Sequence, residues 1–217
     1  MLHQLLRLLK LFLGLFLYAL GIVLTMKANV GYAPWEVFHA GIANVLNLQI
    51  GTVVIIFGLL FGLIAFIFGE KIGLGTLFNI IFIGMFMNGL LNSSLFVESK
   101  NLISAYAQLI VGLFVISFAT FFYISSGFGA GPRDSIMVLI ARKTNIGVGY
   151  CRIAIEVAAT LIGALLGGML GWGTLVSALL IGFCIQITFK ILRFDPRLVE
   201  HEDLLASLSS IIKVFGN

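Results

Sequence analysis

Two short stretches of this sequence decide its fold. Residues 31–36 read Gly-Tyr-Ala-Pro-Trp-Glu, and residues 129–134, which lie 98 positions later, read Gly-Ala-Gly-Pro-Arg-Asp. Each stretch combines glycine for a sharp turn, a proline that suits the first position of a helix, and an acid that favours the positive helix end. Each stretch therefore predicts the start of a helix, and their likeness indicates a duplicated chain.

The same spacing extends far beyond these two stretches. It aligns residues 14–84 with residues 112–182 without a gap, so that Asn47 falls on Asn145 and the Gly-x-Gly-Thr-Leu motif of residues 73–77 falls on residues 171–175. An alignment that places proline on proline, asparagine on asparagine and acid on acid indicates an internal repeat rather than chance matches among glycines.

The composition indicates an integral membrane protein. Of the 217 residues, 60% are hydrophobic and only 10% are charged, whereas soluble domains average about a quarter charged residues. This composition excludes a soluble enzyme, a nucleic-acid-binding domain and a disordered tail. Cys151 and Cys184 lie in apolar runs without a metal-binding spacing, so we expect no disulfide scaffold, no metal site and no cofactor.

Six apolar runs are long enough to cross a bilayer, which takes roughly 17–25 residues. We expect an all-α membrane protein in which residues 1–100 form one three-helix repeat, residues 101–192 form a second, and residues 193–217 form a cytoplasmic amphipathic tail. The predicted spans are residues 9–26, 51–69, 72–91, 105–126, 149–167 and 172–192.

The distribution of positive charge predicts the orientation. With a cytoplasmic N-terminus, only Lys27 and Lys100 of the 13 lysines and arginines lie outside, and the other 11 lie inside. Both termini are then cytoplasmic. Because each repeat holds three spans, the second repeat enters the membrane from the side opposite to the first, which is an inverted-repeat plan.

A short helix is predicted after the first span of each repeat, over residues 34–47 and 132–145. A helix of 13 residues is about 20 Å long and cannot cross the bilayer. It either enters the membrane as a re-entrant helix, which we favour because the two segments are largely apolar, or lies at the interface. A re-entrant pair implies a central cavity, since backbone at membrane depth must be buried in protein or line a cavity.

The residues at the starts of these short helices are the candidate solute-binding site. The acids Glu36 and Asp134 would bind a cation, a proton or an amine, and Arg133 with the free N–H groups would hold an anion. The alternative is a purely structural role, in which both acids only cap their helices. The complete candidate set is Gly31, Pro34, Trp35, Glu36, Gly129, Gly131, Pro132, Arg133 and Asp134.

Four further polar residues inside the predicted spans are candidates for coupling or gating. Arg152 and Glu156 lie one helical turn apart and can pair, and Glu156 is an ionisable group well inside a span. Asn88 and Gln186 occupy equivalent positions of the two repeats. They either line the solute path or form hydrogen bonds between helices.

The chain resembles the YczE/YyaS/YitT family of bacterial integral membrane proteins, and its YczE-like branch in particular. The resemblance is carried by residues 129–134, by the Ile136–Arg142 segment and by the Gly-Trp-Gly-Thr turn of residues 171–174. It implies a multi-pass protein of the bacterial cytoplasmic (inner) membrane. It transfers no substrate-binding residues to this chain.

We therefore expect a transporter of a small polar or charged metabolite, with a binding site at the membrane midplane between the repeats. One alternative is a channel of the same architecture, and another is an accessory protein that docks a cytoplasmic partner through residues 193–217. No motif of an enzyme is present in the sequence. The expected partners are the lipid bilayer and a small-molecule or ion solute, and the sequence leaves homo-oligomer formation open.

Overall fold

The computed structural model describes residues 2–70, 72–93, 95–129, 131–199, 202 and 204. Within them, six helices are long and apolar enough to cross a membrane, as the sequence predicts. The helices are α1 (Leu2–Lys27), α2 (Pro34–Leu46), α3 (Ile50–Ile67), α4 (Leu74–Asn92), α5 (Leu102–Ser125), α6 (Pro132–Thr144), α7 (Val148–Leu165), α8 (Trp172–Ile191) and the short 3-10 helix η1 (Pro196–Leu198). The expected bounds agree to within about three residues, except that α1 begins at Leu2 instead of residue 9.

The two short helices form where the sequence predicts them, and for the expected reasons. A proline opens both α2 and α6, and both end at an asparagine with positive φ, Asn47 (52°) and Asn145 (56°). Asparagine tolerates this left-handed conformation better than most residues. Of the amphipathic tail expected over residues 193–217, the structure describes residues 193–199, which include η1, together with Glu202 and Leu204; the rest lies outside the described residues.

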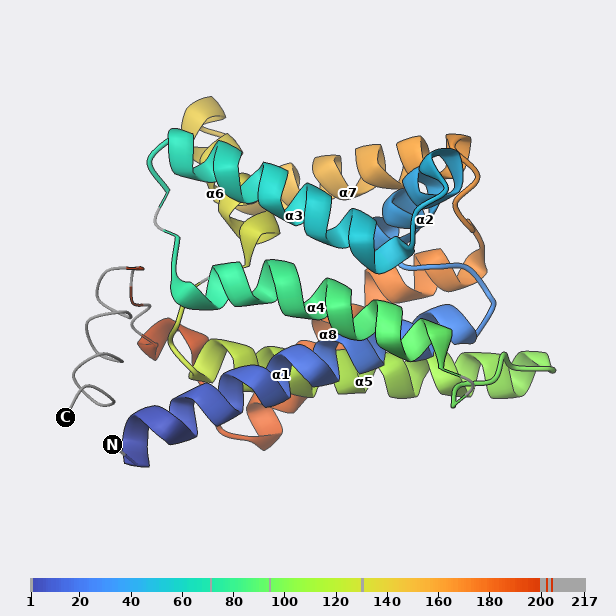
Figure 1. The fold of residues 1–217 in the computed structure, drawn as a ribbon, viewed down its shortest axis with the longest axis horizontal. Coiled ribbons are helices and arrows are strands. Elements are labelled where there is room, and N and C mark those ends of the chain that lie inside the picture. Colours follow the sequence, from blue (N-terminus) through green and yellow to red (C-terminus); the bar gives the residue numbers. More distant parts are fainter. Residues whose placement is uncertain are drawn as a thin grey trace.

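The helices α1 to α8 lie in two layers (Figure 1). In one layer, α1 packs along α5, and these two helices are flanked by α4 and α8. We call it the α1–α5 layer. In the other, α2 packs against α7, α3 packs against α6, and the short helices contact their own neighbours α3 and α7. We call it the α2–α7 layer.

Glycines permit the closest helix crossings within each layer. A Cβ atom on Gly21 of α1 would lie 2.9 Å from the carbonyl oxygen of Gly112 on α5. A Cβ atom on Gly41 of α2 would overlap the carbonyl of Gly163 on α7. Small residues of this kind let helix backbones approach closely in membranes.

The connections before the short helices are tied to the opposite half of the chain. Gly75 at the start of α4 donates its N–H to the carbonyl of Phe128 (2.7 Å), and Gly173 at the start of α8 donates to Val30 (2.7 Å). The two donor residues are 98 positions apart in the sequence, and so are the two acceptor residues. Gly31 and Gly129 beside these acceptors have φ of 114° and 121°, a region that favours glycine.

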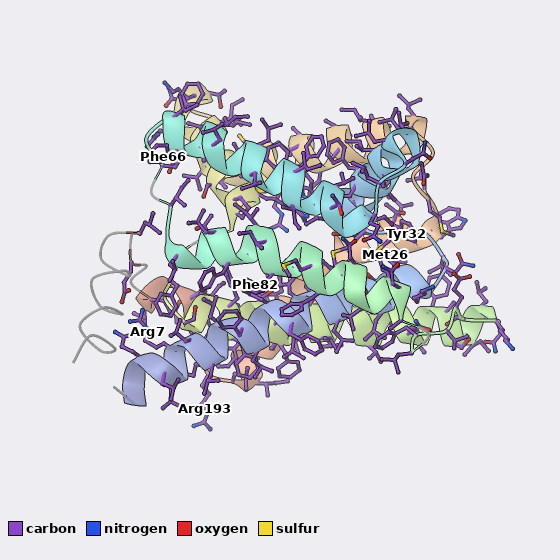
Figure 2. All side chains as sticks on the ribbon, viewed as in Figure 1. Arg7, Met26, Tyr32, Phe66, Phe82 and Arg193 are labelled. Carbon is purple, nitrogen blue, oxygen red and sulfur yellow. The ribbon has the colours of Figure 1, made fainter. Side chains whose placement is uncertain are left out.

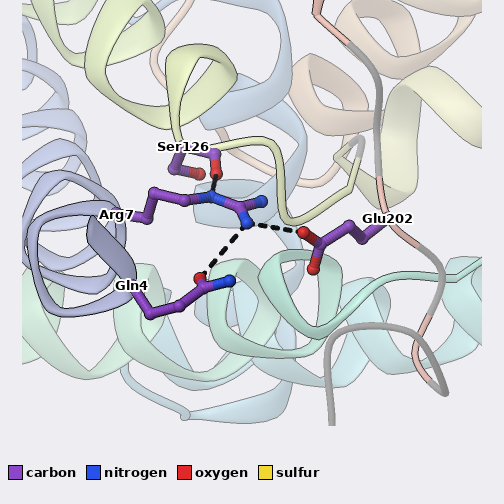
Figure 3. A network of polar contacts seen from close by, with 4 residues as sticks. All are labelled: Gln4, Arg7, Ser126 and Glu202. Carbon is purple, nitrogen blue, oxygen red and sulfur yellow. Dashed lines mark hydrogen bonds and ion pairs between the residues drawn. The ribbon is translucent and has the colours of Figure 1, made fainter. Parts of the chain in front are cut away.

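We call the end of the bundle where α1 and α4 begin and α3, α5 and α8 end the N-terminal face. At this face Arg7 of α1 donates hydrogen bonds to the carbonyl of Ser126 (2.9 Å), to the Gln4 side chain (3.2 Å) and to the carboxylate of Glu202 (2.5 Å), as Figure 3 shows. The Arg7 network thus joins α1, the end of α5 and the segment after η1.

The outward sides of both layers carry apolar side chains (Figure 2). Phe66 near the end of α3, for example, is 64% exposed. Such surfaces suit lipid contact, since the bilayer removes them from water. The largest buried apolar cluster instead lies between α1, α4 and α5, where Leu11, Leu15 and Met87 are fully buried.

Candidate functional site

A cavity lies between the two layers. Its larger chamber has a volume of about 220 Å³, and a second chamber of about 90 Å³ shares six lining residues with it. The shared residues are Tyr18, Ile22, Trp35, Arg133, Arg152 and Glu156. Four of these six come from the candidate residues that the sequence identifies.

The short helices place their first turns at this cavity. Trp35 and Glu36 follow the opening proline of α2, and Arg133 follows the opening proline of α6. Because the free N–H groups of a helix lie in its first turn, both positive helix ends are at the site. The arrangement therefore combines two helix starts with charged side chains of both signs.

Arg133, Trp35 and Glu36 form one group across the two short helices. The guanidinium carbon of Arg133 lies 4.8 Å from the centre of the Trp35 ring, a cation–π arrangement. Its Nη1 atom lies 3.9 Å from Oε1 of Glu36, which is an ion pair but too long for a hydrogen bond. The guanidinium makes no hydrogen bond to the described residues.

The second charged pair of the cavity lies on α7. Nε of Arg152 donates to Oε1 of Glu156 at 2.9 Å, one helical turn away. The Arg152 side chain is half exposed, whereas that of Glu156 is 20% exposed. The pair that the sequence predicts is therefore formed, and Glu156 faces the cavity.

Burial shifts the titration of the groups on α2, which is not one of the six span-length helices. Desolvation raises the pKa of Glu36, and the charge of Arg133 offsets part of that rise. Desolvation lowers the pKa of His39 well below its ordinary value, and Arg133 lowers it further. In the preceding loop, burial and the charge of Glu98 raise the pKa of Tyr32.

The remaining candidates of the sequence analysis occupy different places. Pro34, Gly129, Gly131 and Pro132 line the cavity. Gly31 packs instead against the start of α8, where its Cβ would lie 2.7 Å from the Gly171 Cα. Asp134 lies in α6, but its side chain is outside the part of the chain that the structure describes.

Asn88 and Gln186 lie outside the cavity lining. Asn88 accepts the N–H of Gly51 at 2.8 Å and donates to the Thr52 hydroxyl at 3.1 Å. It therefore forms interhelical hydrogen bonds, which was one of its two expected roles. Gln186 is exposed on α8.

Sequence reasoning missed several polar residues that line the cavity, namely Tyr18, Asn79, Thr120, Tyr123 and Ser177. Asn79 and Ser177 are 98 residues apart, so the repeat offered a signal for this pair. Ser177 is 1% exposed, and its hydroxyl has no hydrogen-bond partner among the described residues. Tyr18 and Thr120 have no polar counterpart in the other repeat, and nothing in the sequence singles them out. Tyr123 aligns with Thr25, so the repeat offered a signal for this position as well.

The two layers meet closely at the face opposite the N-terminal face, through α3 and α4. A Cβ atom on Gly51 would overlap the carbonyl of Gly84, and one on Gly84 would overlap that of Gly51. Asn88 bonds to Gly51 at the same place. The start of α3 and the end of α4 therefore close this end of the cavity. We call this contact the α3–α4 seam.

The equivalent helices of the second half do not make this contact. α7 and α8, all of whose backbone is described, do not pack along each other. Added Cβ atoms on Gly149 and Gly182, the counterparts of Gly51 and Gly84, would meet no described atom within 4 Å. Arg152 is half exposed, whereas its counterpart Val54 is only 7% exposed in the α3–α4 seam.

Comparison with known proteins identifies relatives along nearly the whole chain. The model of a family of unknown function (DUF6198) matches residues 5–190. An uncharacterized protein of Haemophilus influenzae is 30% identical over 191 residues, which cover 86% of this chain and 87% of that protein. The uncharacterized membrane protein YczE of Bacillus subtilis is 31% identical over 183 residues, which cover 82% of each chain.

A more distant relative extends the same group. The uncharacterized protein YyaS of Bacillus subtilis is 22% identical over 184 residues, which cover 82% of this chain and 90% of that protein. No solved structure matches the chain. Together with the six apolar helices, these matches identify a multi-pass membrane protein. The chain therefore belongs to the DUF6198 family, which groups it with proteins of the YczE and YyaS type.

Proposed function

We propose that this protein transports a small polar or charged solute by alternating access, with the charged cavity between the two layers as the solute site. The observation that carries the proposal is the difference between equivalent helix pairs. The α3–α4 seam closes one end of the cavity, whereas α7 and α8 do not pack along each other. Such asymmetry is expected when a protein built from inverted repeats adopts either its inward-open or its outward-open conformation.

The packing of the helices supports an inverted-repeat plan. Exchanging the two halves converts the α1–α4 contact into the α5–α8 contact, and the α2–α7 contact into the α6–α3 contact, and all four occur. The loop hydrogen bonds to Phe128 and Val30 exchange in the same way. These exchanges support an approximate two-fold relation between the halves, from which the α3–α4 and α7–α8 pairs depart.

The second state follows from the same relation. If the α2–α7 layer rocks against the α1–α5 layer, α7 can close on α8 while α3 leaves α4. Gly149 and Gly182 would then pack as Gly51 and Gly84 do now, and Gln186 would take the place of Asn88. The solute would be released at the face where the α3–α4 seam had been.

The short helices fit a re-entrant role in this scheme. Their first turns lie at the cavity between the layers, which is where irregular backbone is tolerated within a membrane. We place the N-terminal face in the cytoplasm of a bacterial inner membrane, because the sequence segments expected on that side carry 11 of the 13 lysines and arginines. The state shown then faces the cytoplasm.

Paired cysteines test the proposal. The parent for this test is the variant C151A/C184A, which removes both native cysteines. The pair T52C/N88C replaces two side chains that touch in the α3–α4 seam, and Y150C/Q186C replaces their counterparts on α7 and α8. Disulfides require Cα atoms roughly 4.4–6.8 Å apart, so each pair reports closure at one face.

We expect both pairs to cross-link in membranes, and we expect either cross-link to prevent the other in a four-cysteine variant. The pairs T52C/Q186C and Y150C/N88C, which combine opposite faces, serve as controls and should not react. Complete reaction of T52C/N88C with no reaction of Y150C/Q186C, however long the oxidation, would mean one fixed structure and would refute alternating access. A channel predicts that both cross-links coexist.

A further inference from the structure

The arrangement of Arg133 suggests the chemistry of the solute. A guanidinium carries five N–H donors in one plane and pairs with planar acceptors through two parallel bonds. In Arg133 the guanidinium carbon lies over the Trp35 ring, and no described residue accepts a hydrogen bond from the guanidinium N–H groups. A carboxylate of a solute fits these N–H groups, because it accepts two such bonds at once.

Glu36 competes with the solute carboxylate for Arg133. It is 6% exposed, and Arg133 is the cation it pairs with. A second carboxylate on Arg133 would place two negative charges around one guanidinium, which strongly disfavours ionisation of both acids. A proton on Glu36 removes the conflict, because it neutralises Glu36 and leaves Arg133 for the solute.

The other groups around Glu36 do not remove this conflict. From α7, Glu156 faces Glu36 and adds negative charge, while Arg152 is bonded to Glu156. α3 carries no titratable side chain, and the polar cavity-lining group of α8 is the Ser177 hydroxyl. Tyr18 from α1 lines the same chamber, and His39 lies on α2 itself.

Ser177 supplies a second polar contact in the chamber shared with Glu36. Its hydroxyl is buried without a hydrogen-bond partner among the described residues, and such groups normally have one. The larger chamber of about 220 Å³ is below the roughly 300–1,000 Å³ of sites for drug-sized ligands. The solute is therefore small.

We propose that the solute is a small carboxylate that binds the Arg133 guanidinium beside Trp35, and that one proton enters on Glu36 with each carboxylate. The proposal rests on the proposed function of the cavity as a solute site. The carboxylate displaces Glu36 from Arg133, and the proton comes from the aqueous phase. Binding thus couples the movement of an anion to the movement of a proton.

Tryptophan fluorescence tests the proposal directly. The chain contains two tryptophans, so the variant W172F leaves Trp35 at the site as the only one. Benzoate is the probe, and benzamide and benzylamine are its neutral and cationic counterparts. We expect benzoate alone to change the Trp35 emission of the purified full-length protein, with an affinity that rises up to about tenfold for each unit fall in pH.

Two variants separate the roles of the paired residues. E36Q keeps the shape of the side chain but needs no proton, so benzoate should bind it tightly and without dependence on pH. R133Q should lose benzoate binding at every pH, while R133K keeps the charge but not the planar fork and should bind weakly. S177A should weaken binding without altering its pH dependence. Thermal unfolding of each variant shows that it is folded.

Other outcomes would overturn the proposal. Binding of benzylamine instead of benzoate would mean that the carboxylates, not Arg133, select the solute. An unchanged pH dependence in E36Q would place the proton elsewhere. If no probe binds while each of the cross-links Y150C/Q186C and T52C/N88C still forms and prevents the other, the proposed class of solute is wrong but alternating access is supported. If the cross-links also fail, the proposed function is wrong.

Discussion

If the cavity alternates between two states as proposed, the substitution Gly84→Ala should shift the balance between them. The new Cβ would overlap the carbonyl of Gly51 and lie 2.5 Å from Cγ1 of Ile55, so α3 and α4 could not keep their present distance. Overpacking of this kind costs about 1–3 kcal/mol. The cost falls on the state with the closed α3–α4 seam and is relieved when α3 leaves α4.

The size of the shift follows from that cost. About 1–3 kcal/mol changes the ratio of the two states roughly 5- to 150-fold. The assay is the rate of Y150C/Q186C cross-linking, which reports the state with α7 and α8 closed. We expect Gly84→Ala to raise that rate by a factor in this range when the two states exchange faster than the disulfide forms.

Two glycines provide matched comparisons. Gly182 is the counterpart of Gly84, and an added Cβ meets no described atom in the present state. Gly182→Ala should therefore slow Y150C/Q186C cross-linking, because it would obstruct α7 and α8 as they close. Gly89 on α4 also meets no described atom, so Gly89→Ala should leave the rate unchanged. Equal rates in all three variants would refute the reasoning.

Three further predictions concern stability and the tail. Gly31→Ala should lower the unfolding temperature more than Gly69→Ala, because both have positive φ but only Gly31 would also collide with described atoms; differential scanning fluorimetry measures the difference. Since burial raises the pKa of Glu36, its proton is held more tightly in the folded state, and stability should be highest in acid and fall as the pH rises past the unfolded-state value. E36Q should lack that fall in unfolding scans across pH, and a fall of the same size in E36Q would contradict the assignment. Arg7→Ala removes the partly buried ion pair with Glu202. Since such a pair contributes about 1 kcal/mol, we expect limited proteolysis to cleave the chain after η1 about fivefold faster in the variant. An unchanged cleavage rate would mean that the ion pair does not hold the segment after η1 in place.

Much of the fold could be predicted because the same pattern of motifs and apolar runs occurs in both halves of the sequence. The starts of α2 and α6, their asparagine ends and the six apolar spans all follow from local chemistry and length. The predicted start of α1 at residue 9 is too late, because the charges of Arg7 and Lys10 mark the boundary of the apolar run and not that of the helix. Helices continue past the membrane when their charged residues find partners, as Arg7 does.

The candidate site was predictable only in part, for a physical reason. Arg133 and Glu36 could be expected at one cavity because both begin short helices of the repeat. The cation–π contact of Arg133 with Trp35 depends on how α2 and α6 are placed relative to each other, which no local pattern specifies. Ser177 and Thr120 line the cavity because of the way α8 and α5 pack in the bundle, and the difference between the α3–α4 and α7–α8 pairs has no counterpart in a local sequence pattern.

The crossed loop hydrogen bonds have a consequence for biosynthesis. The loop at Val30 and Gly31 finds its partners at Gly171 and Gly173, about 140 residues later in the chain. At about 5–20 residues per second, a ribosome needs roughly 7–28 s to make that stretch. Until then α2 has only α3 to pack against and lacks α7, so the first half should expose surface that membrane chaperones or proteases can recognise. A gene split after residue 100 should still yield a working protein, provided that both fragments are made together and insert in opposite orientations.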